Sequence, residues 1–140
     1  NNATAKPLNN IIGDESNIKF KIQSANLKNY NTYGSNKIEK AENDSKKNYE
    51  EVEVKKIDDF DYDKAISFMK IDIQGYDLMA LKGAKKTIKT HKMPIVFEYT
   101  PEFAEELKYS FKDFEDFINE IDYYIVKKID YYNYLILPKN

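Results

Sequence analysis

Acidic and amide side chains follow two apolar runs in the second half of the chain. The run "SFMKID" ends at Asp72, which precedes Gln74 and Asp77, and the run "MPIVFE" ends at Glu98. A carboxylate at the end of a buried strand can accept a proton from a substrate hydroxyl or bind a ligand, because the carboxyl ends of parallel strands open into the crevice where α/β proteins bind their ligands. The alternative is structural, since a carboxylate at a helix start also satisfies backbone N–H groups.

The elements that would position these residues are two strand-helix units. The continuous apolar run at 66–72 is typical of a strand buried on both faces. After Gly75, apolar residues recur with helical spacing at Leu78, Leu81, Ala84 and Ile88. A second apolar run covers 93–99, and Thr100, Pro101 and Glu102 are a favourable helix start. The apolar stripe of this second helix is predicted to be Phe103, Leu107, Phe111, Phe114 and Ile118.

Strands are predicted on both sides of these units. The stretches "NIKFKIQ" and "YEEVEVKKI" alternate apolar and polar residues, as half-buried strands do. Between them, residues 26–48 are polar and are predicted to be a long loop. The last segment, "YYIVKKIDYYNYLILPK", predicts an antiparallel hairpin that turns near Asp130 to Asn133. We expect one domain over residues 1–140.

Composition argues against several classes of function. All 22 basic residues are lysines, and the net charge is -2. Because arginine is the side chain best suited to phosphate and guanine, nucleic-acid binding is not expected. The chain has no cysteine, which excludes disulfides and thiolate metal sites, and we predict no metal site. No apolar run approaches the roughly 20 residues of a membrane helix. We therefore predict a cytoplasmic protein that does not bind membranes.

Residues 69–84, "MKIDIQGYDLMALKGA", resemble the strand-to-helix signature of the FkbM family of S-adenosylmethionine-dependent methyltransferases. That signature reads Lys-Ile-Asp-Val-Glu-Gly-x-Glu, followed by Leu-x-x-Leu-x-Gly-Ala. The stretches "VEVKKIDDF", "PIVFEYTPE" and "NNIIGDESNIKF" are similar to neighbouring parts of such domains. Two positions depart from the signature: Gln74 cannot titrate as the usual acid does, and Asp77 is a shorter acid.

The resemblance implies an α/β fold, a Rossmann-like class I methyltransferase domain with a mostly parallel sheet and a C-terminal antiparallel hairpin. It implies S-adenosylmethionine as cofactor and methyl transfer to an oxygen, on a sugar or another small-molecule hydroxyl. In this reading Asp72 is the catalytic residue that assists the acceptor hydroxyl. Gln74, Glu98 and Asp77 are the predicted substrate-binding residues.

One feature of such methyltransferases is missing from the sequence. They bind the cofactor at a glycine-rich turn after the first strand, whereas Gly13, Gly34, Gly75 and Gly83 are far apart. We therefore expect the N-terminal cofactor-binding half to lie outside this chain, and we assign no cofactor-binding residue. The strand at 66–72 would then need another strand, a missing segment or a partner chain to cover its edge.

Two other functions remain open from the sequence. The chain could be a degenerate, non-catalytic methyltransferase-like module that binds a partner or a glycan. It could also bind carbohydrate through the tyrosines of the C-terminal hairpin, although such residues are more often cross-strand pairs. These tyrosines are Tyr123, Tyr124, Tyr131, Tyr132 and Tyr134.

Overall fold

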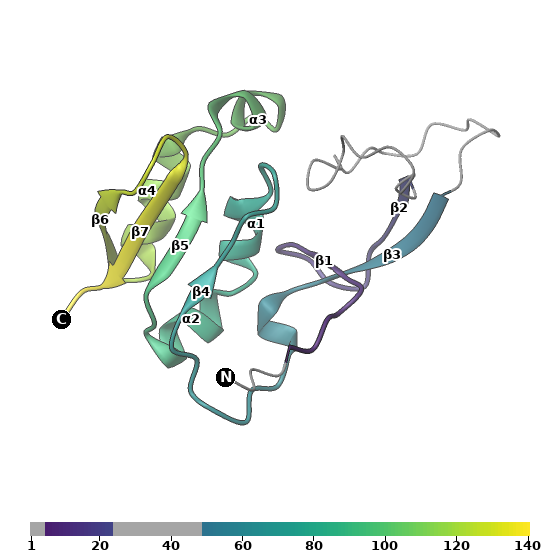
Figure 1. The fold of residues 1–140 in the computed structure, drawn as a ribbon, viewed down its shortest axis with the longest axis horizontal. Coiled ribbons are helices and arrows are strands. Elements are labelled where there is room, and N and C mark those ends of the chain that lie inside the picture. Colours follow the sequence, from purple (N-terminus) through teal and green to yellow (C-terminus); the bar gives the residue numbers. More distant parts are fainter. Residues whose placement is uncertain (1–4, 24–48) are drawn as a thin grey trace.

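The computed structural model describes residues 5–23 and 49–140, whose strands form two separate sheets (Figure 1). The predicted loop at 26–48 lies entirely outside the described residues. The strands are β1 (Ile11–Ile12), β2 (Lys19–Gln23), β3 (Tyr49–Lys55), β4 (Met69–Lys70), β5 (Ile95–Glu98), β6 (Tyr123–Lys128) and β7 (Asn133–Pro138). The helices are the short 3₁₀ turn η1 (Ile57–Asp59), α1 (Asp77–Lys82), α2 (Lys85–His91), α3 (Pro101–Glu106) and α4 (Phe111–Glu120).

The larger sheet has the strand order β4-β5-β7-β6. Strands β4 and β5 are parallel, as expected for strands joined through helices, while β7 runs antiparallel to both β5 and β6. Helices α1, α2 and α4 lie on one face of this sheet, and α3 lies beyond the end of β5 (Figure 1). The smaller sheet has the order β1-β3-β2, with β1 parallel and β2 antiparallel to β3.

The core lies between the larger sheet and its helices. Phe97 of β5 and Phe114 of α4 are fully buried, and their rings stack with centroids 4.8 Å apart. Tyr123 of β6 is also buried, and its hydroxyl donates a hydrogen bond to the Met93 carbonyl over 3.0 Å, so its polar atom is satisfied. Phe97 is therefore held against α4 on the helix side of the sheet. Because Glu98 is the next residue and the last of β5, this packing also fixes the position of Glu98.

The prediction of a mostly parallel sheet is not confirmed. Three of the five strand pairings in the described residues are antiparallel: β2 with β3 in the smaller sheet, and β7 with both β5 and β6 in the larger sheet. The predicted C-terminal hairpin is confirmed as β6 and β7. Its first strand contains a register irregularity between Ile125 and Lys127, a β-bulge that leaves Val126 without a partner residue on β7.

The helix predicted after Gly75 is divided in two at Gly83. A Cβ atom on Gly83 would lie 1.9 Å from the backbone carbonyl oxygen of Gly13, so the chain turns there against the segment that follows β1. Helix α2 then begins with help from a distant residue. The Asp58 carboxylate accepts the backbone N–H groups of Lys86 and Thr87, over 2.9 and 2.8 Å, which satisfies donors that a helix start leaves unpaired.

The second predicted helix is also divided. Helix α3 starts at Pro101 as predicted and ends at Glu106. Lys108 adopts a left-handed conformation with φ of 60°, and Ser110 then caps α4 in a capping box with Asp113. The apolar stripe continues through this break, which is why spacing alone predicted a single helix. In residues 5–23 and 49–140, no helix has the length and apolar character needed to cross a membrane.

Candidate active site

Three carboxylates lie where β4 and β5 end. Because the two strands are parallel, their carboxyl ends reach the same edge of the larger sheet (Figure 1). Asp72 follows the end of β4 by two residues, Glu98 is the last residue of β5, and Asp77 is the first residue of α1. We call these three residues the acid cluster. The sequence predicted this arrangement for Asp72 and Glu98, since both follow apolar runs.

Asp77 is the buried member of the acid cluster, with 0% of its surface exposed. Its Oδ1 atom accepts the backbone N–H of Glu98 over 3.0 Å, and its Oδ2 atom accepts the backbone N–H of Ile73 over 3.4 Å. Burial raises the pKa of Asp77, and these backbone donors act in the opposite direction. Asp77 therefore joins the ends of both strands, while its predicted contact with substrate stays a prediction.

Glu98 is half-buried, and its Oε2 atom is buried with no hydrogen-bond partner among the described residues. Burial, followed by the negative charges of Asp72 and Asp77, raises the pKa of Glu98, whereas the positive charge of Lys70 lowers it. Glu98 thus retains its proton to a higher pH than an ordinary glutamate. In that state its carboxyl group can donate a hydrogen bond to a ligand.

Asp72 is the solvent-accessible member of the acid cluster, with a side chain that is 47% exposed. Its Oδ2 atom lies 3.1 Å from the Lys70 Nζ atom. Asp72 is also close enough to Glu98 for its charge to raise the pKa of that residue. Asp72 therefore lies between solvent and the partly buried Glu98, where an approaching ligand can reach it.

The turn between β4 and α1 differs from what the sequence suggested. If the strand continued, Gln74, two residues after Asp72, would point in the same direction as Asp72, but β4 ends at Lys70. Gln74 and Gly75 have φ values of 54° and 95°, and the Tyr76 N–H donates to the Ile73 carbonyl over 3.4 Å. These φ values fit a type I′ turn, in which both central residues are left-handed. Because Gln74 lies in this turn and not in a strand, strand geometry does not place its side chain beside that of Asp72.

Glycine is required at the second position of this turn. A Cβ atom on Gly75 would lie 2.6 Å from the Cβ of Phe103, so α3 packs directly against the turn. The Tyr109 hydroxyl, which follows α3, donates a hydrogen bond to the Gly75 carbonyl. Burial and the charge of Asp77 raise the pKa of Tyr109, so this hydroxyl stays protonated and able to donate. No local sequence pattern connects Tyr109 with the turn, 34 residues away from Gly75.

A second group of polar contacts connects the acid cluster with the hairpin. The Lys70 Nζ atom, besides contacting Asp72, donates to the Asn133 Oδ1 atom over 2.8 Å. Asn133 in turn donates through Nδ2 to both carboxylate oxygens of Asp130, each over 3.0 Å. Sequence reasoning missed this connection because it depends on β7 lying beside β5, where Asn133 is the register partner of Glu98.

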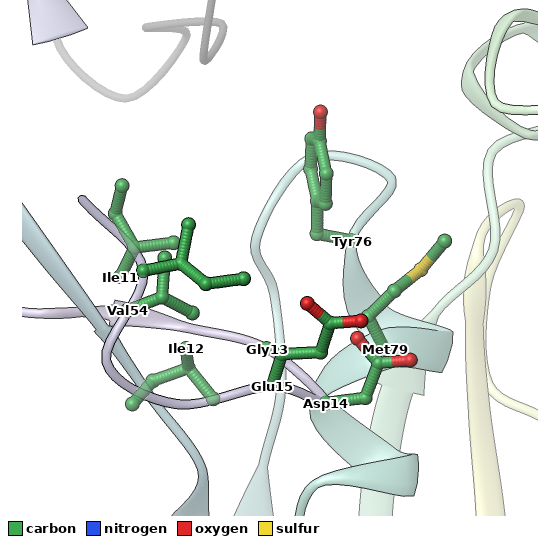
Figure 2. Close-up of a pocket in the computed structure, with 9 residues that line it drawn as sticks. Ile11, Ile12, Gly13, Asp14, Glu15, Val54, Tyr76 and Met79 are labelled. Atoms are coloured by element: carbon green, nitrogen blue, oxygen red, sulfur yellow. The ribbon is translucent and has the colours of Figure 1, made fainter. Parts of the chain in front are cut away.

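A small pocket lies between β1, β3 and the start of α1 (Figure 2). Its volume is about 130 Å³, and most of its surface is apolar. Tyr76 and Met79 lie on one side and Ile11 and Val54 on the other (Figure 2). The lining is completed by Ile12, Gly13, Asp14, Glu15 and Ile18. Tyr76 precedes Asp77, so one short segment contributes to both the pocket and the acid cluster.

The acid cluster is not arranged as a metal site. No group of three or more histidine, cysteine, aspartate or glutamate side chains in residues 5–23 and 49–140 has an arrangement that could hold a metal ion. What the cluster offers instead is an accessible carboxylate beside a partly buried acid with a raised pKa. This combination suits proton exchange with a neutral hydroxyl ligand.

Comparisons with known proteins agree on one family. The chain matches the model of the methyltransferase FkbM domain over residues 2–125. It is 31% identical to the methyltransferase FkbM from Methylobacillus flagellatus KT, whose crystal structure is known, over 61% of this chain and 23% of that chain, with a TM-score of 0.43. The chain thus spans about a quarter of the length of that solved chain. No curated protein matches the chain.

Proposed function

Because this chain belongs to the FkbM methyltransferase family, we propose that it supplies the acceptor side of an S-adenosylmethionine-dependent O-methyltransferase. The observation that carries this proposal is the acid cluster, in which the accessible Asp72 lies beside the partly buried Glu98 at the shared end of β4 and β5. The acceptor would be a hydroxyl group of a sugar or of another small molecule.

Methyl transfer to a hydroxyl oxygen requires one proton acceptor. S-adenosylmethionine, when bound, would supply an electrophilic methyl group on a positively charged sulfur, and the sulfur would keep the electron pair of the carbon–sulfur bond. As the acceptor oxygen forms its bond to that methyl carbon, its hydroxyl proton passes to the Asp72 carboxylate, so charge and atoms balance. Asp72 suits this step because it is solvent-accessible and because Lys70, 3.1 Å away, fixes its orientation.

The other residues of the site have supporting roles in this proposal. Glu98, with its raised pKa, donates a hydrogen bond to a second oxygen of the acceptor. Gln74, in the turn before α1, stays a predicted substrate-binding residue. Asp77 is a positioning residue, since it accepts the backbone N–H groups of Glu98 and Ile73.

The residues of the small pocket fit part of the cofactor. The apolar walls of the pocket accept a purine ring, and the carboxylates of Asp14 and Glu15 can accept hydrogen bonds from an amino group or from ribose hydroxyls. No two glycines among the described residues are close enough in the sequence to form a glycine-rich turn. We therefore assign no residue to the amino-acid portion of the cofactor.

A non-catalytic function is the alternative, and the spacing of the glycines is the observation that favours it. In that case the chain would be a methyltransferase-like module that binds a partner or a glycan. The predicted cytoplasmic location stays a prediction, as does the proposal that a partner chain or another segment covers the free edge of β4. Within the described residues, β4 pairs with β5 alone.

Calorimetric titration of the chain with S-adenosylmethionine tests the proposal. We expect saturable binding that weakens in an Asp14→Asn, Glu15→Gln double variant and stays unchanged in a control with Asp63→Asn, which is exposed and outside the pocket. Transfer of a radiolabelled methyl group to a panel of sugars and small alcohols is measured in parallel. Folded chain that neither binds the cofactor nor transfers the label would favour the non-catalytic module.

A further inference from the structure

The turn between β6 and β7 is held by hydrogen bonds within the turn itself. Asp130 accepts the backbone N–H groups of Tyr132 and Asn133 over 2.9 and 2.8 Å, as an Asx turn does. The Ile129 N–H donates to the Asn133 carbonyl over 2.7 Å, which closes the hairpin. The backbone of this turn is therefore well defined, although most of its side chains face solvent.

The β6–β7 turn lies next to the strand end that carries Glu98. The Tyr99 N–H donates to the Tyr132 carbonyl over 2.8 Å, and Tyr99 directly follows Glu98. Asn133 is paired with Glu98 across the sheet and accepts a hydrogen bond from Lys70, the residue that contacts Asp72. The turn thus lies at the same end of the larger sheet as the candidate active site, where β5 ends and β7 begins (Figure 1).

Two aromatic rings project from this turn into solvent. Tyr131 is 87% exposed and Tyr132 is 43% exposed. Their ring centroids are 6.5 Å apart, with a tilt of 51° between the planes. Neither ring contributes to the core. Exposed aromatic groups at the edge of a polar site are a common sign of ligand contact, because Tyr offers a large rigid surface at a small cost in conformational entropy.

The family match does not account for the turn. The matched residues end at 125, before Tyr131 and Tyr132. A role for these tyrosines must therefore be argued from their own surroundings. Those surroundings include the Asp130 carboxylate within the turn and Glu98 of the neighbouring strand, which precedes Tyr99 and pairs with Asn133.

We propose that Tyr131 and Tyr132 form an acceptor-binding shelf that stacks against the ring of a sugar, an inference that rests on the proposed function. A pyranose has C–H groups on its faces and hydroxyl groups around its rim. The tyrosine rings bind the C–H face, while carboxylates at the sheet edge accept hydrogen bonds from the hydroxyls.

Binding of methyl glycosides to the folded chain tests the shelf. Methyl β-D-glucopyranoside, methyl α-D-mannopyranoside and methyl β-D-galactopyranoside are titrated one at a time, and the tyrosine ring signals are followed by NMR. We expect at least one glycoside to shift the signals of Tyr131 and Tyr132. Tyr131→Ala should weaken that binding about fivefold to tenfold, the usual value of one aromatic contact, and Tyr131→Phe should keep it within about twofold.

Tyr124 provides a matched control. It is 45% exposed on the same hairpin but lies near the opposite end, where it pairs with Leu137. Tyr124→Ala should leave glycoside binding unchanged. The shelf is refuted if no glycoside binds, if binding is equally strong in Tyr131→Ala, or if Tyr124→Ala weakens it as much.

Methyl transfer to the same glycosides separates this inference from the proposed function. If glycosides bind at the shelf but receive no methyl group in the presence of S-adenosylmethionine, the shelf stands and the catalytic proposal fails. If methyl transfer occurs with alcohols that have no sugar ring, and Tyr131→Ala does not alter its rate, the catalytic proposal stands and the shelf fails.

Discussion

Asp77 accepts the backbone N–H of Glu98 over 3.0 Å, so the first residue of α1 fixes the last residue of β5. The same side chain accepts the N–H of Ile73, which follows β4. A single buried carboxylate thus sets the spacing of two strand ends, and Asp72 and Glu98 both depend on that spacing. The acid cluster is therefore built around the member that a ligand cannot easily reach.

Replacing Asp77 should destabilise the fold. In Asp77→Ala two backbone N–H groups lose their acceptor inside the protein, and we expect the free energy of unfolding to fall by about 2 to 4 kcal/mol. Asp77→Asn should cost less, because one oxygen acceptor remains. Urea denaturation monitored by circular dichroism measures both. Asp116→Ala is the control: Asp116 is exposed and paired with Lys112 on α4, so its effect should stay within about 0.5 kcal/mol.

Replacing Asp72 should affect turnover far more than stability. Asp72→Asn removes the proposed proton acceptor, and methyl transfer should fall by about 10²- to 10⁴-fold. Because the side chain is 47% exposed, the free energy of unfolding should change by less than about 1 kcal/mol. The assay is transfer of a radiolabelled methyl group, with Asp63→Asn as the control for an exposed acid. An unchanged rate in Asp72→Asn would remove Asp72 from the mechanism.

The raised pKa of Glu98 has a consequence for stability. A carboxyl group with a higher pKa in the folded protein than in the unfolded chain stabilises the fold fully below its unfolded pKa, and this contribution is lost as the pH rises through the folded pKa. For Glu98 the loss begins near its ordinary value of 4.5 and extends upward. Stability of the wild type should therefore decrease with rising pH over this range.

Glu98→Gln tests this effect, because glutamine does not titrate. We expect the variant to gain stability relative to the wild type as the pH rises above 4.5, measured by urea denaturation at a series of pH values. A stability difference between Glu98→Gln and wild type that does not depend on pH would contradict the raised pKa.

Gly83→Ala should have the opposite sign from the usual helix substitution. Alanine normally stabilises a helix relative to glycine by about 1 kcal/mol. Here the added Cβ would lie 1.9 Å from the Gly13 carbonyl oxygen, which is backbone and cannot easily move. We expect a loss of about 1 to 3 kcal/mol, typical of overpacking. Lys82→Ala, at the exposed neighbouring position, should stay within about 0.5 kcal/mol, and a stabilising Gly83→Ala would contradict the close approach.

Much of the fold could be predicted from local patterns. The two strand-helix units and the hairpin are local features of apolar spacing and turn residues, and the structure contains all of them. The divisions at Gly83 and Lys108 were missed because helical spacing continues through both. The glycine at 83 was the available signal, since glycine inside a helix often marks a close backbone approach.

The site could be predicted only in part. Carboxylates after apolar runs indicated Asp72 and Glu98, because strand ends have a sequence pattern. The hydrogen bonds from the α2 backbone to Asp58 and from Lys70 to Asn133 join residues 28 and 63 positions apart, so no local pattern predicts them. They follow from which strands become neighbours, a property of the assembled sheet.

The bulge at Val126 determines how the larger sheet can grow. Strand β6 is its outer strand, and an outer strand with regular hydrogen-bonding groups invites pairing with another molecule. The bulge interrupts that regular array, and the exposed Lys127 and Lys128 follow it. Additional strands are thus disfavoured on the hairpin side. A further strand can therefore pair with this sheet beside β4, its other outer strand, so the sheet can be extended in one direction only.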